Sequence, residues 1–188
     1  MEIIWKGNSV FEVRGKKAVV AVDNGEIGVL ESGKSFTWPG EYEVKEIPII
    51  ALSAWTKSKS KEETEGAKGD ETLIIHFIVD GIRCCHLGEL GHILPSDIVN
   101  KIGDVDVLMV EFGAGTNLDN KKAIEVIEAI EPRSVVPMGT NANAASLKEL
   151  GAEDVIVQDK FVIKSQSDLP NDKRIYILLS NNYSDRIS

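Results

Sequence analysis

Short apolar runs separated by turn-forming residues fill the first thirty positions, and this spacing constrains the fold more than any other feature. Each run is short enough for a strand and too short for a helix. The intervening dipeptides, Gly7-Asn8, Gly15-Lys16 and Asn24-Gly25, favour the tight turns that join antiparallel strands. The N-terminal region therefore predicts an antiparallel meander. Its strands are expected at residues 3–5, 10–13, 18–22 and 27–30.

Two further turns extend this pattern toward the middle of the chain. Trp38-Pro39-Gly40-Glu41 combines a proline, which fixes one backbone dihedral, with a glycine that tolerates a positive one. It leads into an extended segment that we expect at residues 42–52. Asp80-Gly81 then joins the runs 73–79 and 82–85 and predicts the clearest hairpin of the chain.

The second half alternates between helical and strand patterns. Pro95 and Gly103 delimit a short helix at residues 95–102, and apolar residues recur with helical spacing across residues 119–130. A strand, a helix and a second strand in this order imply a parallel crossover. The remaining elements are expected as strands at 105–112, 134–138, 155–157, 161–163 and 174–179 and as a helix at 144–150.

This order of elements predicts an α/β fold of the αββα sandwich type. Two mixed β-sheets are expected face to face, with helices on the outer faces. The 188 residues suit a single domain covering positions 1–188. Residues 56–70 are mostly Lys, Ser, Glu, Gly and Thr, which predicts a polar surface loop; whether this loop closes over a site is left open.

Charge and cysteine usage narrow the function classes. The formal net charge of -9 repels phosphate, so we expect neither nucleic-acid nor membrane binding. No secretion leader opens the sequence, and no run approaches the roughly 18 apolar residues that cross a bilayer. The two cysteines are adjacent and cannot staple a loop, which favours the reducing cytoplasm. The usage of Lys, Glu and Ile suits a prokaryotic protein.

The stretch Cys84-Cys85-His86-Leu87-Gly88-Glu89-Leu90-Gly91-His92 concentrates the residues that could carry chemistry. Its two glycines allow the sharp turns on which hydrolytic metal sites are often built. The neighbourhood has no cationic run that would activate a thiol, so we expect Cys84 and Cys85 to be inert packing residues. The third histidine, His76, lies within an apolar strand pattern and is expected to be a core histidine rather than a ligand.

Six short segments between position 5 and about position 140 occur in the order of the landmarks of a known family. They are Trp5-Lys6-Gly7-Asn8-Ser9-Val10-Phe11, Val22-Asp23, Pro39-Gly40-Glu41-Tyr42-Glu43-Val44, His86-Leu87-Gly88-Glu89-Leu90-Gly91-His92, Gly103-Asp104-Val105-Asp106-Val107-Leu108, and Glu131-Pro132 with Val136-Pro137-Met138. They resemble the small, single-domain branch of the metallo-β-lactamase fold that is described as metal-dependent hydrolases. The resemblance implies one or two metal ions, held by a histidine-rich motif, an acid in a Gly-Asp turn and a late histidine.

Compared with that family, the chain differs at four expected positions. Asn8 replaces the opening histidine, Glu89 replaces the aspartate, and Gly139 stands where the late histidine is expected. The histidine-rich motif would fall on Leu52-Ser53-Ala54-Trp55-Thr56, which contains neither His nor Asp. The resemblance leaves His86, Glu89 and His92 as candidate metal ligands, with Glu89 and His86 as candidate catalytic residues. Asn8, Asp23, Trp55 and Gly139 are expected to flank the site.

A catalytic zinc needs about three protein ligands and a bound water, and so few donors favour a site that has lost its metal. Our leading hypothesis is a metallo-β-lactamase-fold protein with a degraded hydrolytic site and no cofactor, which serves as a binding or structural module. The alternative is a hydrolase of ester or phosphodiester substrates with one Zn, Mn or Fe ion at His86, Glu89 and His92. That site could borrow a ligand such as Asn8, Asp23 or His76.

Other binding functions are also open. The partner is expected to be an unknown small molecule or a second copy of the chain, as a homo-oligomer. A third class is an anion-binding domain that uses the turn at residues 113–116, although this turn lacks the lysine of a nucleotide-binding loop. Trp5, Trp38 and Trp55 are expected in core or edge packing, and Trp55 could fill the vacated metal pocket.

Overall fold

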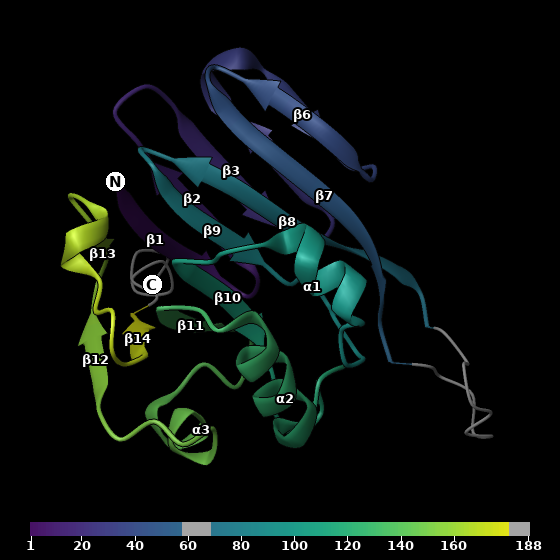
Figure 1. The fold of residues 1–188 in the computed structure, drawn as a ribbon, viewed down its shortest axis with the longest axis vertical. Helices are drawn as coiled ribbons and strands as arrows, with labels where there is room; N and C mark the ends of the chain where they lie inside the picture. The colour runs from purple at the N-terminus through teal and green to yellow at the C-terminus, as the bar shows by residue number, and fades with distance from the viewer. Residues whose placement is uncertain (58–68, 181–188) are drawn as a thin grey trace, which may run out of the picture.

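The N-terminal strands form an antiparallel sheet, as the turn dipeptides predict. The computed structural model describes residues 1–57 and 69–180 (Figure 1). All strand pairs in this six-stranded sheet are antiparallel in the described part of the chain. Its strands, in spatial order, are β13 (Phe161–Val162), β1 (Glu2–Gly7), β2 (Val10–Arg14), β3 (Val19–Asp23), β4 (Glu26–Val29) and β5 (Lys34–Phe36).

An eight-stranded mixed sheet packs against the first. One side of it is parallel and the other side, which contains the predicted hairpin at Asp80-Gly81, is antiparallel. The strands run in the order β12 (Val155–Gln158), β14 (Ile175–Leu179), β11 (Ser134–Met138), β10 (Val107–Glu111), β9 (Ile82–His86), β8 (Glu71–Val79), β7 (Ile47–Trp55) and β6 (Gly40–Val44). The parallel crossovers inferred from the second half of the sequence are therefore confirmed.

Alternating apolar side chains build two cores, one on each face of the eight-stranded sheet. Between the sheets, residues such as Phe11, Val20, Ile75 and Met109 are fully buried. The opposite face of the eight-stranded sheet is covered by three α-helices (Figure 1). These are α1 (Ser96–Ile102), α2 (Asn120–Ile130) and α3 (Ala144–Glu149).

The helix positions follow from local signals in the sequence. The side chain of Asp119 accepts a hydrogen bond from Lys122 N at 2.9 Å and caps α2, and the side chain of Asn143 caps α3 in the same way through Ser146 N. The apolar face of α2 is buried at Ala123, Val126, Ile127 and Ile130. No helix within residues 1–57 and 69–180 combines the length and apolar composition that a bilayer crossing requires.

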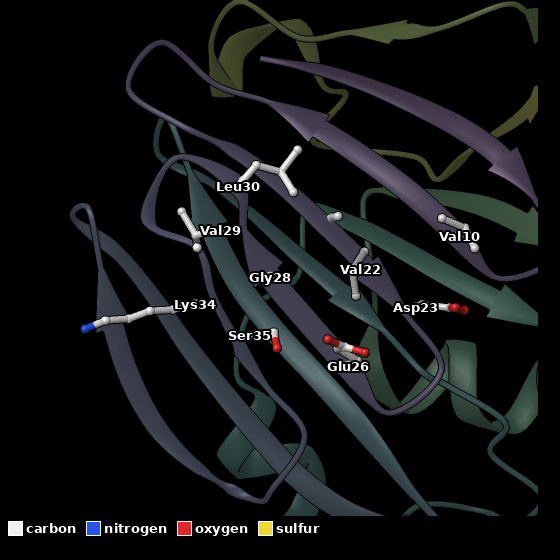
Figure 2. A pocket seen from close by; sticks show the side chains of 11 residues that line it. Val10, Val22, Asp23, Glu26, Gly28, Val29, Leu30, Lys34 and Ser35 are labelled. Atoms are coloured by element: carbon white, nitrogen blue, oxygen red, sulfur yellow. The ribbon is translucent and has the colours of Figure 1, made fainter.

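The predicted two-sheet sandwich is confirmed, and the described helices gather on one of its outer faces. In the part of the chain that the structure describes, the outer face of the six-stranded sheet carries no α-helix. A shallow groove of ≈ 330 Å³ lies there instead, with small residues such as Ala21 and Gly28 among its lining (Figure 2). Asp23 and Glu26 lie at one end of this groove, and Lys34 lies toward the other (Figure 2).

Two sequence predictions are wrong in this region. The segment 42–52 is not one strand, because Lys45 and Glu46 adopt positive φ values of 53° and 62° and form a tight hairpin turn between β6 and β7. Neither residue is a usual turn former in this conformation, so no local signal marks this turn. Trp38 does not pack in the core: it is 73% exposed, and its carbonyl accepts a hydrogen bond from the Tyr42 hydroxyl at 2.9 Å.

The polar loop has the predicted bounds, since β7 ends at Trp55 and β8 begins at Glu71. Residues 58–68 of this loop lie outside the described residues, so whether the loop closes over a site stays open. The single-domain assignment stays a prediction. Thr56 and Asp70 close the base of the loop through a hydrogen bond from Thr56 N to Asp70 O of 2.9 Å.

A buried ion pair anchors β9 to β10. Asp106 is fully buried and accepts hydrogen bonds of 2.9 Å from the Nε and one terminal nitrogen of Arg83, with Arg133 at 3.3 Å. Burial alone would raise the pKa of Asp106, but these guanidinium contacts hold it below its usual range. Asp104 contacts the same Arg83 from a position 85% exposed. The two aspartates, which alternate around the start of a strand, therefore share one arginine.

Candidate functional site

One edge of the sandwich collects most of the residues that the sequence singled out. Parallel strands β9, β10 and β11 end there, and ligands in open parallel sheets bind outside such carboxyl ends. The turns of the six-stranded sheet reach the same edge, because Gly139 N donates to Asn8 O at 2.8 Å and Asn24 Nδ2 donates to Glu89 Oε1 at 3.1 Å. Residues from both sheets thus meet in one small region, which we call the site edge.

His86, the last residue of β9, is fully buried between the sheets. Its Nε2 donates a hydrogen bond of 2.8 Å to Ser9 O, and its Nδ1 accepts one of 3.1 Å from Gly88 N. Since a carbonyl can only accept and a backbone N–H can only donate, the ring is the neutral Nε2–H tautomer. Burial lowers the pKa of His86 to about 4, against smaller opposing effects of Ser9 O and Asp23. Both ring nitrogens are therefore committed to backbone groups.

Glu89 turns toward the six-stranded sheet. Its side chain is partly buried, and its backbone N–H donates to Thr72 Oγ1 at 3.2 Å. The hydrogen bond from Asn24 fixes one carboxylate oxygen. On the same turn, Asp23 accepts hydrogen bonds from Ser9 Oγ and from Asn24 N. The acids at positions 23 and 89 thus hold the two turns together through Asn24.

His92 lies beside Trp55 rather than beside His86. The two rings are tilted by 39° with centroids 6.0 Å apart. His92 Nε2 accepts a hydrogen bond of 3.3 Å from Trp55 N, so its Nδ1 carries the proton and donates to Ile93 O at 2.9 Å. Like His86, His92 uses both nitrogens on the backbone.

Glu111, at the end of β10, is a site residue that the sequence reasoning missed. Burial raises the pKa of Glu111, and the nearby charge of Glu89 raises it further. Its carboxylate occupies the space beside Gly139, so that a side chain built at position 139 would overlap it. A signal was present: Glu111 is the one charged residue of the strand sequence VLMVE, and it stands at the carboxyl end of a parallel strand.

These placements test whether the residues present fit the metal that the fold family implies. Among the described residues, no group of three or more His, Cys, Asp or Glu side chains is placed to hold a metal ion. His86 and His92 would each have to give up a backbone hydrogen bond to expose a lone pair or change tautomer. Glu89 and Glu111 remain as two neighbouring carboxylates. As placed, the donor set does not fit a catalytic zinc ion.

The remaining candidates face elsewhere. His76 is buried, as expected, but it pairs across the strands with Cys85 and so lies on the sheet face opposite His86. Its Nε2 has no hydrogen-bond partner in the described part of the chain, and burial lowers its pKa. Cys84 and Cys85 are free and fully buried, and burial raises the pKa of both thiols far above its usual value. Buried neutral thiols fit the predicted packing role.

The turn at residues 113–116 also uses its own polar groups. Gly113 N donates to Leu118 O at 2.9 Å and Thr116 N donates to Gly113 O at 3.3 Å. The side chain of Asn141 bonds to the carbonyls of Phe112 and Ala114. An anion would have to compete with these internal bonds, so the turn is a poor anion cradle.

The sandwich of two sheets with a site edge at the carboxyl ends of its parallel strands defines a metallo-β-lactamase-type fold. A family model described as a β-lactamase superfamily domain matches residues 18–139, and the chain therefore belongs to this family.

Individual relatives agree with this assignment. A metal-dependent hydrolase from Thermococcus onnurineus is 25% identical over 103 residues, which cover 54% of this chain and 44% of the relative. One from Carboxydothermus hydrogenoformans is 26% identical over 102 residues, which cover 54% and 45%. The chain thus spans less than half of the length of these curated relatives.

Solved structures show the same fold. A metallo-β-lactamase superfamily structure from Thermotoga maritima has a TM-score of 0.70 at 19% identity and covers 94% of this chain and 97% of its own. A metallo hydrolase from Ignicoccus hospitalis has a TM-score of 0.53 at 15% identity and covers 79% and 84%.

Proposed function

We propose that this chain is a β-lactamase superfamily protein that has lost the hydrolytic metal centre and serves as a binding or structural module. The observation that carries the proposal is the commitment of both ring nitrogens of His86 to Ser9 O and Gly88 N. A buried imidazole with two backbone partners acts as a structural bridge between the sheets. A metal ligand instead needs one nitrogen lone pair directed at the ion.

The neighbouring residues support the same conclusion. Position 139 cannot regain a histidine without displacing Glu111, and Glu89 is tied to Asn24. A hydrolytic zinc acidifies a bound water only when about three ligands hold the ion and leave a position open. The outer groove, with Val10, Val29 and Leu30 among its lining, offers apolar surface that a small-molecule ligand could contact. Two inert thiols suit the cytoplasmic setting that is part of this proposal.

Metal content tests the proposal. The protein would be purified without added metal, analysed for zinc, manganese and iron, and titrated with each ion by calorimetry. We expect less than stoichiometric metal and no tight binding. If any metal is found, His86→Gln tests whether its binding depends on His86. Glu128→Gln, on the exposed face of α2, is the matched control. Stoichiometric, tightly bound metal in the unaltered protein would overturn the proposal.

The alternative is a hydrolase with one metal ion at His86, Glu89 and His92. The observation that favours it is the pair of neighbouring carboxylates Glu89 and Glu111: burial raises the pKa of Glu111, and the charge of Glu89 raises it further. The names of the relatives point the same way. This alternative requires that metal content and turnover of a model ester or phosphodiester are both lost in His86→Gln and Glu89→Gln. Activity that survives both substitutions would exclude it.

A further inference from the structure

Asn24 and Gly25 form the tight turn between β3 and β4, and they are the one asparagine–glycine pair in the sequence. Asn24 is exposed, as are Asp23 and Glu26, which flank the turn and are labelled in Figure 2. The turn belongs to the site edge, because Asn24 Nδ2 donates to Glu89 Oε1 at 3.1 Å. A chemical change in this one amide would therefore affect the contact between two turns.

The surroundings of Gly25 leave its backbone nitrogen open to reaction. In any chain, the nitrogen that follows an asparagine can attack the side-chain amide carbon, and a side chain on the following residue hinders that attack. Glycine has no Cβ and does not hinder it. A Cβ built at Gly25 would meet no heavy atom within 4 Å beyond its chain neighbours. The Gly25 N–H has no acceptor among residues 1–57 and 69–180, so no hydrogen bond has to break before the nitrogen reacts.

The other asparagines of the sequence lack this combination. Each of them is followed by a residue that carries a side chain, as Asn8 is by Ser9. Asn141 is further restrained, because its side-chain amide donates to the carbonyls of Phe112 and Ala114 at 3.1 Å. Reaction at an asparagine side chain should therefore concentrate at position 24.

We propose that Asn24 is a site of spontaneous deamidation, with water as the co-reactant. Gly25 N forms a bond to Asn24 Cγ, and Nδ2 leaves as ammonia together with the proton of the Gly25 N–H, which closes a five-membered succinimide. Water then adds to either ring carbonyl, breaks its bond to the nitrogen and returns a proton to that nitrogen. The product is aspartate or isoaspartate. No metal or substrate takes part, so this inference stands independently of the proposed function.

Deamidation replaces a hydrogen-bond donor by an acceptor at the site edge. The new carboxylate takes the place of the amide that donates to Glu89 Oε1, and Asp23 adds a further negative charge to the same turn. Two carboxylates at this distance repel each other, and neither supplies a proton to the other at neutral pH. The modification therefore breaks the link between the β3–β4 turn and the turn that carries Glu89.

Peptide mapping tests the modification. The full chain would be incubated at about 37 °C and pH 8, sampled over several weeks and digested with trypsin, with a sample at time zero to correct for conversion during digestion. Asn24 is the one Asn or Gln in peptide 18–34, so the mass gain from replacing NH by O reports on it alone. This peptide should convert about tenfold faster than peptide 7–14, which contains Asn8, since only Asn24 precedes a glycine. Conversion no faster than at Asn8 would overturn the proposal.

Alanine substitutions separate the attack from the conformation of the turn. Gly25→Ala should slow the conversion of Asn24 about tenfold, because the added methyl group hinders the nitrogen. The φ of Gly25 is +69°, so alanine also strains the backbone. Gly33→Ala is the matched control, since Gly33 has a φ of +64° and equally open surroundings, and it should leave the rate unchanged. Circular dichroism checks that both variants fold. An unchanged rate in Gly25→Ala would overturn the proposed attack.

Asn24→Asp reproduces the aspartate product and tests its effect on the site edge. Its urea midpoint at pH 7 should be lower than that of the unaltered chain. Adding Glu89→Gln should restore the midpoint, because the glutamine then donates to the new aspartate and the pair has exchanged donor and acceptor. Glu89→Gln alone completes the double-mutant cycle. Additive effects of the two substitutions would contradict the proposed loss of the Asn24–Glu89 link.

Discussion

The Nε2–H group of His86 reaches across the sandwich to the carbonyl of Ser9, 77 residues earlier in the chain, and joins the end of β9 to the β1–β2 turn. The ring also packs edge-on against Phe11, with centroids 6.1 Å apart. These contacts tie the end of β9 to the six-stranded sheet. Replacing His86 should therefore change the stability of the protein.

Stability should fall as His86 approaches protonation. The pKa of this histidine is lowered to about 4 in the folded protein and is near 6.5 in the unfolded chain. Above pH 6.5 both states are neutral and no difference arises. Between pH 6.5 and 4 the unfolded state binds the extra proton, so His86 lowers the free energy of unfolding by up to about 3 kcal/mol at the acid end.

Urea denaturation at several pH values between 7.5 and 4.5 measures this effect. His86→Gln keeps an N–H donor but does not titrate, so its free energy of unfolding should decline less than that of the unaltered protein across the same interval. His76→Gln is the comparison for the other buried histidine, whose pKa burial also lowers. Parallel pH profiles for His86→Gln and the unaltered chain would show that the ring does not resist protonation.

Replacing the buried Asp106 should also lower the stability of the protein, for a different reason. Asp106→Asn leaves Arg83 and Arg133 with an uncharged partner at a fully buried position, and removing one member of a buried ion pair typically costs about 3 to 5 kcal/mol. Asp104→Asn removes a contact to the same Arg83 at an exposed position and should cost less than about 1 kcal/mol. Urea denaturation at pH 7 would measure the loss in free energy of unfolding for both variants. Equal costs would mean that burial does not set the strength of this pair.

Acid should affect Asp106 in its own pH window. The pKa of Asp106 is held below its usual range, so its contribution is complete above the unfolded pKa of about 4 and is lost as the pH falls below it. The His86 effect occurs above this window. The acid limb of the unfolding profile should therefore shrink in Asp106→Asn and remain in His86→Gln.

The fold could be predicted because its signals are local. Asp119 marks the start of α2 with a side chain that caps it, and Gly103 follows the end of α1. Asp80-Gly81 fixes the register of β8 on β9, which puts Ile75 and Phe77 in the core. The turn at Lys45-Glu46 escaped prediction because its conformation depends on the strands that it joins rather than on its own residues.

The sequence could predict where the candidate site lies but not which partners its side chains contact. Asn8, Glu89 and Gly139 do lie at one edge, where the motif order places them. The partners of each side chain were not predictable, since the bond from His86 to Ser9 and the overlap of Glu111 with position 139 join segments far apart in sequence. Such pairings depend on how the two sheets dock, and no local pattern encodes that docking.

Replacing Glu111 should stabilise the protein at neutral pH. The pKa of Glu111 is raised by burial and by Glu89, so the folded state holds the proton more tightly than the unfolded state does. Stability from this group is present at low pH and is lost as the pH rises through the unfolded pKa toward the folded one. Glu111→Gln removes that loss, so its free energy of unfolding should exceed that of the unaltered protein at pH 7 and not at pH 4.

The same carboxyl group can be observed directly. In a carbon-detected NMR titration, Glu89→Gln should lower the titration midpoint of Glu111, because one of the two causes of its raised pKa is gone. Glu128→Gln is a distant control on α2 and should leave the midpoint unchanged. A midpoint that does not move in Glu89→Gln would show that the two carboxylates do not interact.

Gly139 carries two separable requirements for glycine, and a substitution series can separate them. Its φ of +77° disfavours any other residue, and a side chain there would overlap the carboxylate of Glu111. Gly139→Ala should therefore cost more than Gly33→Ala, since Gly33 has a φ of +64° and open space around its missing Cβ. The backbone conformation alone should lower the free energy of unfolding by about 1 kcal/mol when either glycine is replaced by alanine.

A double-mutant cycle separates the two requirements. Adding Glu111→Ala to Gly139→Ala should recover only the stability lost through overlap, which urea denaturation would measure. Additive effects of the two substitutions would mean that Glu111 does not fill the space beside position 139.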